Sequence, residues 1–410
     1  MKNVLTVLLA GGVGARLHPL TRNRAKPAVP FGGQFRIVDF TLSNCINSEC
    51  TRIQVLVQYK SLSLVRHIRQ GWNILNSSRG EYIETIAPQM RVNENWYQGT
   101  ADALYHNLYS LEKADPKEVL ILSGDHIYKM NYQKMIHFHR EREADVTIAT
   151  IDVPIDQGSQ FGILGTDGER RVVAFDEKPL APKPLPNDPS RALASMGIYV
   201  FNPEILKEAV VRDSERDTAH DFGRDIIPEL IDRQKNVYAY PFQDENKKQA
   251  IYWRDVGTLD TYWEANMDLA SVDPLFNLYD KDWPLHTYLP VYPPVKFVFA
   301  SPGQRYGVAI DSIVCNGSII SGGMVKRSVL SPGVRINTGA EVDESILFAG
   351  CSIGRHAKIR RAIIEKNVAV PPNTHIGYNL EEDAKWHRIS PQGIVVVESL
   401  EQRLAPVKSH

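Results

Sequence analysis

A repeat of short apolar segments in the last quarter of the chain constrains the fold more than any other feature. The triplets start at intervals of 16, 17 and 17 residues and occupy positions 312–314, 328–330, 345–347 and 362–364. Between them, apolar residues recur at every sixth position, as in Leu330, Ile336 and Val342. A six-residue period is typical of a parallel β-helix, in which each coil buries its apolar face against the next coil. The pattern therefore predicts a parallel β-helix of hexapeptide-type coils over residues 301–410. A β-sandwich with regular turns is the disfavoured alternative.

The first two-thirds of the chain has a different character, because short apolar runs alternate with longer amphipathic stretches. This alternation predicts an α/β domain over residues 1–272. A segment rich in proline and aromatic residues, 273–300, is the expected linker to the β-helix. We expect helices over 101–113 and 132–142, and strands over 4–10, 53–58, 119–123, 146–151, 172–176 and 197–201.

Composition excludes several classes of protein. The chain carries 47 Lys and Arg against 48 Asp and Glu, so no basic excess favours nucleic acid as a partner. The apolar run 4–10 is too short for a bilayer span, which argues against a membrane partner. Four scattered cysteines form neither a disulfide framework nor a zinc motif, and this pattern favours a cytoplasmic protein. One asymmetry stands out: no acidic residue precedes Asp39, although six Lys and Arg do.

A glycine-rich segment directly follows the first predicted strand. It reads Gly11-Gly12-Val13-Gly14-Ala15-Arg16-Leu17, and Lys26 follows ten residues after Arg16. Glycines at a strand end let backbone amides approach a phosphate, and the two cations favour a triphosphate. The segment is neither a Walker P-loop, which needs Gly-Lys-Ser/Thr, nor a dinucleotide fingerprint, which needs glycine where Leu17 stands. A tight connection without a ligand is the structural alternative.

Acidic residues stand at the ends of other predicted strands. Asp125 follows an apolar strand, and the carboxyl ends of strands in open α/β sheets are where ligands bind, so Asp125, Gln58 and the glycine loop are expected to converge. Asp125 is suited to hold Mg²⁺, with Asp255 as a second carboxylate or merely a turn residue. Glu177 and Lys178 offer an acid beside a base. We interpret His126, His137 and His139 as surface or helix residues, because no third ligand lies at a metal-binding spacing.

These segments together resemble the sugar-1-phosphate nucleotidyltransferases, and among them the bacterial glucose-1-phosphate adenylyltransferases, also called ADP-glucose pyrophosphorylases. The resemblance runs in order through residues 9–17, 24–33, 95–103, 123–128, 177–179, 193–201 and 252–258. It implies a Rossmann-like, mixed or parallel sheet in the nucleotidyltransferase catalytic domain, followed by a left-handed parallel β-helix for regulation and oligomerisation. The implied reaction joins ATP and α-D-glucose 1-phosphate to give ADP-glucose and pyrophosphate, the committed step of bacterial glycogen synthesis.

The resemblance also implies roles for individual residues and partners. Arg16, Lys26 and Asp125 would be catalytic, and Asp125 with Asp255 would hold Mg²⁺ as the cofactor. The nucleotide would bind Gly11, Gly12, Gly14, Gln58, Gly99 and Thr100, whereas glucose 1-phosphate would bind Tyr97, Glu177, Lys178 and Ser195. A homotetramer is the family expectation, as is regulation by small allosteric effectors such as sugar phosphates, pyruvate or nucleotides.

Asn23 departs from the family pattern. Some members bind a sugar-phosphate activator through a lysine at this position, so Arg22 or Arg24 substitutes here or a different effector is used. Three other functions stay open: a nucleotidyltransferase that uses UTP or dTTP, a catalytically silent regulatory subunit, and a hexapeptide acyltransferase. The last would need a catalytic histidine, and only His356 and His375 fall in the predicted coils.

Overall fold

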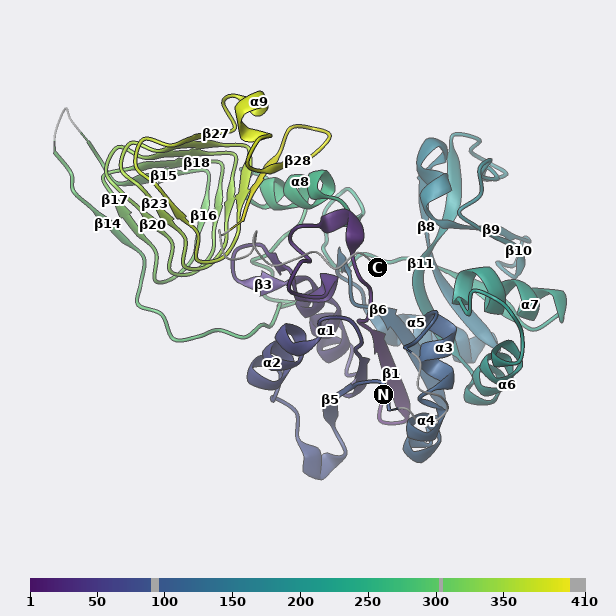
Figure 1. Ribbon diagram of the computed structural model, residues 1–410. Helices are drawn as coiled ribbons and strands as arrows, with labels where there is room; N and C mark the ends of the chain where they lie inside the picture. Colours follow the sequence, from purple (N-terminus) through teal and green to yellow (C-terminus); the bar gives the residue numbers. More distant parts are fainter. Residues whose placement is uncertain (90–95, 302–304, 399–410) are drawn as a thin grey trace.

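The computed structural model describes residues 1–89, 96–301 and 305–398. Its N-terminal half is built on a mixed sheet in the order β10-β9-β11-β6-β1-β4-β5, to which β8 is added beside β11 and β12 beside β8. Figure 1 shows this sheet beside a prism of stacked coils formed by the C-terminal half. The bounds of its strands are β1 Val4–Leu9, β4 Arg52–Leu56, β5 Tyr82–Ile86, β6 Glu118–Ser123, β8 Val146–Pro154, β9 Gly162–Thr166, β10 Val172–Glu177, β11 Arg191–Phe201 and β12 Val237–Pro241.

Strand directions in this sheet decide where the site lies. Strands β1, β4, β5 and β6 are parallel neighbours, whereas β11 runs antiparallel to β6, β8 and β9. The carboxyl ends of β1, β4 and β6 therefore meet at one edge of the sheet, as the sequence predicted. Gln58 lies just beyond β4, which ends two residues earlier than expected because Leu56 is the last residue paired with β1.

Helices cover both faces of the sheet, because the side chains of each strand alternate between two apolar clusters. On β1, Val4 and Leu8 pack with α1, α2 and α5, whereas Leu5 and Val7 pack with α3, α4, α6 and α7. The predicted helix 101–113 is in fact two helices, interrupted at residues 106–107, where the Asn107 side chain donates to the carbonyl of Ala103. The helices are α1 Ile37–Asn47, α2 Leu62–Gly71, α3 Thr100–Tyr105, α4 Leu108–Ala114, α5 Tyr132–Glu141, α6 Pro203–Ser214, α7 Ile227–Asp232, α8 Leu259–Leu269 and α9 Leu380–Asp383.

The predicted parallel β-helix is present as three sheets of short strands, which form the sides of the prism in Figure 1. Strands of successive coils pair in parallel, such as Ile336 with Ile353, whereas β28 is added antiparallel to β29 at the end of the third sheet. The first sheet contains β14 Lys296–Val298, β17 Ile319–Ser321, β20 Arg335–Ile336, β23 Ser352–Ile353 and β26 Ala369–Val370. The second contains β15 Val308–Ile310, β18 Met324–Lys326, β21 Glu341–Asp343, β24 Lys358–Arg360 and β27 His375–Ile376. The third contains β16 Ile313–Val314, β19 Val329–Leu330, β22 Ile346–Leu347, β25 Ala362–Ile364, β29 Val395–Val397 and β28 Arg388–Ile389.

The first coil begins earlier than the sequence suggested. Strand β14 lies inside the range 273–300 assigned to a linker, because its backbone already pairs with β17 of the next coil. The final residues of the range 301–410, namely 399–410, lie outside the described residues, as do 302–304.

The two halves share an apolar core. Leu17 and Leu20, just after the glycine loop, belong to the same buried cluster as Ile346 and Phe348 of the β-helix. Helix α8 lies at this junction (Figure 1), where the indole nitrogen of Trp263 donates to the carbonyl of Glu344. The glycine loop is therefore packed against the β-helix as well as against its own sheet. Among the described helices, none is long and apolar enough to cross a membrane.

Candidate active site

A pocket of about 720 Å³ opens at the sheet edge where β1, β4 and β6 end. It collects the residues that the sequence singled out, with Gly14 as the exception. The pocket is lined by Gly11, Gly12, Arg16, Lys26, Gln58, Tyr97, Gly99, Thr100, Asp125, Glu177, Lys178, Ser195 and Asp255. These residues come from positions between 11 and 255 of the sequence, and the folding of the N-terminal half around its sheet brings them together. Asn95, the first residue of the 95–103 segment, lies outside the described residues.

Gly14 supports the pocket from behind. Its backbone is left-handed, at φ +62°, and a Cβ there would lie 2.9 Å from the Cβ of Lys26 and 3.1 Å from Cγ2 of Thr21. Thr21 donates a hydrogen bond to the Gly14 carbonyl at 3.0 Å. Only glycine fits this close approach without strain. Gly14 therefore lets the loop lie directly against Lys26, rather than forming part of the pocket wall.

Lys26 lies between two carboxylates. Its Nζ donates to Oδ2 of Asp125 at 2.9 Å and to Oδ1 of Asp255 at 2.7 Å, and its side chain is 7% exposed. Asp125 directly follows β6 and the Gly124 turn, whereas Asp255 ends β13 (Trp253–Asp255), which pairs antiparallel with β7 (His126–Tyr128). Arg16 reaches the second carboxylate through its other oxygen, with Nη2 3.5 Å from Oδ2 of Asp255.

These charges shift the pKa values of their neighbours. Burial alone would raise the pKa of Asp125, but Lys26 and His126 favour the carboxylate and hold this pKa well below its usual range. Burial alone would likewise lower the pKa of Lys26, yet Asp125 and Asp255 outweigh it and raise this pKa. Both groups are therefore charged near neutral pH.

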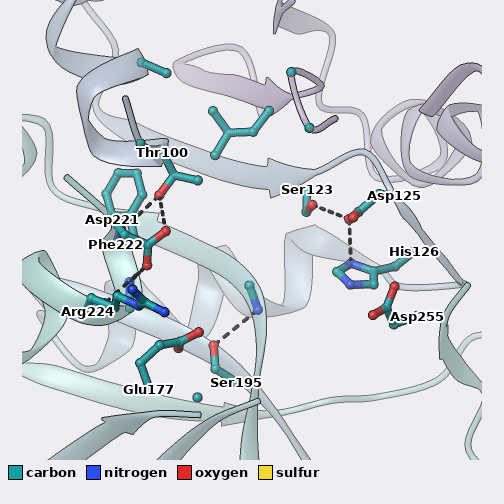
Figure 2. Close-up of a pocket in the computed structure, with 18 of the residues that line it drawn as sticks. Thr100, Ser123, Asp125, His126, Glu177, Ser195, Asp221, Phe222, Arg224 and Asp255 are labelled. Carbon is teal, nitrogen blue, oxygen red and sulfur yellow. Dashed lines mark hydrogen bonds and ion pairs between the residues drawn. The ribbon is translucent and has the colours of Figure 1, made fainter. Parts of the chain in front are cut away.

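His126 corrects one interpretation made from the sequence. It lies on strand β7, opposite Asp255, and it lines the pocket instead of belonging to a helix or the open surface. Ligand atoms of Asp125, His126 and Asp255 all lie within 4.8 Å of one another, so these three residues offer a set that could hold a metal ion. The local sequence around His126 does not reveal this position, because it depends on strand pairing with Asp255, which lies more than a hundred residues away. Figure 2 shows the three side chains together on one side of the pocket.

The donor set fits a divalent cation. Two carboxylates are the ligands that Mg²⁺ takes from proteins when substrate phosphates supply the rest. The Lys26 ammonium already lies between the facing oxygens of Asp125 and Asp255, as an internal cation at this place. The residues present therefore suit the ion that the family resemblance implies.

Gln58 and Tyr97 form a hydrogen-bonded pair in the pocket wall. The amide of Gln58 donates to the Tyr97 carbonyl at 3.2 Å and accepts from the Tyr97 amide at 3.1 Å. Gln58 therefore holds the 97–100 segment against the end of β4. A Cβ on Gly99 would lie 2.2 Å from the His220 carbonyl oxygen, so glycine is required where these two chains touch. Thr100 begins α3 and donates to Asp221 at 3.0 Å.

Glu177 and Lys178 lie across the pocket from the carboxylate pair. Figure 2 shows Glu177 and Ser195 on the side opposite Asp125 and Asp255. Glu177 ends β10, and its Oε1 lies 3.2 Å from Nζ of Lys178, which is 56% exposed. Ser195 accepts a hydrogen bond from Gly197 at 3.2 Å, at a bulge in β11. This side presents hydroxyl and carboxylate groups together with the accessible cation of Lys178, a set suited to a sugar phosphate.

Asp221, Phe222 and Arg224 also line the pocket, although sequence reasoning did not select them. Asp221 accepts from Thr100 and from the amides at 223 and 224, and Phe222 stacks on Tyr199 with ring centroids 5.6 Å apart. In the sequence, Asp221 has only the signature of a helix cap. Its place in the site follows from the packing of residues 219–222 against α3.

Arg22 and Arg24, one of the two alternatives for an effector site, are held by acidic residues of the C-terminal half. Arg24 makes a bidentate ion pair with Glu365, in which its two terminal nitrogens donate to the carboxylate oxygens at 2.9 and 3.0 Å. Nε of Arg22 lies 2.9 Å from Oε1 of Glu398. Asn23 between them is exposed. Neither arginine therefore lies in the main pocket, and both connect the glycine-loop region to the β-helix.

Comparison with known proteins agrees with this division of the chain. Residues 5–272 match the family model described as nucleotidyl transferase, and residues 293–397 match the one described as GlmU-like, C-terminal hexapeptide. A glucose-1-phosphate adenylyltransferase from Rhodopirellula baltica is 52% identical over 100% of this chain and 93% of the relative. Enzymes of the same name from Koribacter versatilis and Methylococcus capsulatus are 53% and 50% identical over 97% and 98% of this chain, and each alignment covers 95% of the relative.

Proposed function

Because the chain belongs to the nucleotidyl transferase family and is similar to glucose-1-phosphate adenylyltransferases along nearly its whole length, we infer that it makes ADP-glucose. It transfers the adenylyl group of ATP to α-D-glucose 1-phosphate and releases pyrophosphate. One observation carries the proposal: a single pocket has Arg16, Lys26 and two carboxylates on one side and Glu177 with Lys178 on the other. Two phosphate-bearing substrates need two such sides.

The triphosphate is assigned to the glycine loop. Gly11 and Gly12 line the pocket directly after β1, and a Cβ on Gly12 would meet nothing within 4 Å, so this backbone faces open space. Arg16 is 66% exposed and can turn toward a ligand while its loop stays packed. The amides and the guanidinium would pair with phosphate oxygens, which is the arrangement that charge-assisted hydrogen bonds favour.

The sugar phosphate is assigned to the opposite side. Glu177 would accept hydrogen bonds from sugar hydroxyls, and Lys178 would pair with the phosphate. An oxygen of that phosphate attacks the α-phosphorus, and the bond from this phosphorus to the pyrophosphate oxygen breaks in line with the attack. This transfer needs positioning and charge stabilisation rather than a protein nucleophile, which matches a site of charged groups on rigid strand ends.

We propose Mg²⁺ as the cofactor, held by Asp125 and Asp255. When bound, the ion would offset the negative charge of the phosphates and help to orient them. The chain's own residues prepare this place: Ser123 donates to Asp125 and fixes its carboxylate, and the pairing of β13 with β7 fixes Asp255.

Several wider features are proposed with the activity. The reaction would be the committed step of bacterial glycogen synthesis. A homotetramer regulated by small effectors fits a catalytic domain whose glycine loop shares a core with a β-helix. A cytoplasmic location fits the four buried free thiols.

The test is pyrophosphate release with Mg²⁺, glucose 1-phosphate and each nucleoside triphosphate in turn. We expect ATP to be preferred; equal or faster release with UTP or dTTP would contradict the adenylyl assignment. Asp125→Asn should lower turnover by about a thousandfold or more, because several kcal/mol of charge stabilisation depend on this carboxylate. Asp176→Asn is the matched control, since Asp176 pairs with Lys183 at 3.1 Å outside the pocket. A chain with no turnover for any nucleotide would be the silent subunit.

A further inference from the structure

The Lys26 ammonium occupies the place that a metal ion would need. The two carboxylate oxygens that face each other, Oδ2 of Asp125 and Oδ1 of Asp255, both accept from Nζ of Lys26, at 2.9 and 2.7 Å. The outer oxygens are engaged elsewhere: Oδ1 of Asp125 accepts from Ser123, and Oδ2 of Asp255 lies 3.5 Å from Arg16. A metal ion that binds both carboxylates therefore has to displace the ammonium from between them.

The backbone of Lys26 is held while the end of its side chain can move. Its carbonyl accepts from the Val29 amide at 3.0 Å, and Gly14 lies against its Cβ. The four-carbon stem allows the ammonium to swing about these fixed atoms. The pocket it would enter is lined by Gly11, Gly12 and Arg16, where the triphosphate is assigned.

Charge decides when the exchange is favourable. An ammonium that leaves two carboxylates without a new anionic partner loses both ion pairs while its own stem stays buried, which is unfavourable. A triphosphate, with about four negative charges near neutral pH, supplies that partner. A metal ion arriving alone brings no anion for Lys26, whereas a metal ion arriving with the nucleotide does.

We propose that Lys26 is an internal counter-ion that keeps the metal site closed to free divalent cations and yields it only when the triphosphate arrives. The ammonium then transfers from Asp125 and Asp255 to the phosphates, so one residue serves first as a metal substitute and then as a nucleotide ligand. This inference rests on the proposed function, because it takes the triphosphate to be the incoming anion.

The experiment measures Mn²⁺ binding to the nucleotide-free chain, by the loss of the electron paramagnetic resonance signal of free Mn²⁺. Lys26→Met removes the ammonium and should raise Mn²⁺ affinity by about tenfold or more, equivalent to about 1.4 kcal/mol. Lys178→Met is the matched control: it removes the same charge from the same pocket without exposing the carboxylate pair, and should change the affinity far less. The double variant Lys26→Met/Asp255→Asn should lose the gain, which would place the new Mn²⁺ at this pair.

Mn²⁺ affinity in Lys26→Met that is no higher than in the unmodified chain or in Lys178→Met would overturn the proposal. Circular dichroism establishes that each variant is folded. Lys26→Gln keeps a hydrogen-bond donor and replaces Lys26→Met if the latter does not fold. The unmodified chain provides a separate measurement: Mn²⁺ binding as tight without nucleotide as with α,β-methylene-ATP would also refute closure by Lys26. Because none of these measurements involves turnover, they are independent of whether the chain makes ADP-glucose.

Discussion

Glu365→Gln should destabilise the chain more than most single substitutions, because it breaks a buried ion pair between the two halves. Glu365 follows β25 of the β-helix and receives both arms of Arg24, with side chains only 5% and 9% exposed. The substitution keeps the size of the side chain but leaves the guanidinium without a counter-charge. Lys366 lies close by, and its pKa is lowered to about 8 by burial and by the charges of Arg24 and Arg36. The unpaired arginine would therefore stand among other cations.

Removing one partner of a buried ion pair typically costs about 3–5 kcal/mol, and we expect a loss in this range for Glu365→Gln. The exposed pair between Arg327 and Asp343 within the β-helix provides the control. Its arginine is 55% exposed, so Asp343→Asn should cost less than about 1 kcal/mol. The double variant Arg24→Met/Glu365→Gln should recover much of the loss, because it leaves no unpaired charge.

Urea unfolding followed by tryptophan fluorescence measures these changes. Trp263 is a suitable reporter, since its indole contacts the Glu344 carbonyl at the junction of the two halves and the Arg361 guanidinium lies 4.6 Å from its ring centroid. The shift of the urea midpoint at constant slope gives the change in free energy of unfolding. A shift for Glu365→Gln no larger than that for Asp343→Asn would refute the reasoning that this pair stabilises the junction.

Two further predictions concern Lys366 and Lys178. Because the pKa of Lys366 is lowered to about 8 from its usual 10.5, its charge destabilises the folded chain below about pH 8, and this penalty fades as the pH rises from 8 to 10.5. Lys366→Met should therefore stabilise the chain more at pH 7 than at pH 10 in urea unfolding; an equal gain at both pH values would contradict the shift. Lys178→Ala should raise the KM for glucose 1-phosphate by about tenfold and that for ATP far less, since one phosphate contact is worth about 1–2 kcal/mol. Lys183→Ala, on an exposed lysine paired with Asp176, should change neither KM, and a proportionate rise in both for Lys178→Ala would argue against its assignment to the sugar phosphate.

Much of the architecture follows from local patterns in the sequence. The six-residue period predicted the β-helix, because each coil repeats the same short strand and turn, and the structure confirms it through pairs such as Ile336 with Ile353. The predicted strands that precede Gly11 and Asp125 are also confirmed, as is their parallel alignment. Boundaries were less accurate where tertiary contacts decide them: β14 begins within the expected linker because a later coil supplies its partner.

The sequence by itself determined which chemical groups the chain carries and which of them follow a strand. The glycine loop follows the first strand within an acid-free opening segment, and carboxylates follow later strands. Only the tertiary structure decided which groups meet. Lys26 contacts Asp125 and Asp255, which are 99 and 229 residues away, and His126 joins them through strand pairing. Arg24, two residues before Lys26 in the same cationic segment, is instead paired with Glu365. The reason is physical: local propensities set strands and turns, whereas contacts between distant residues depend on how sheets and coils pack to bury their apolar faces.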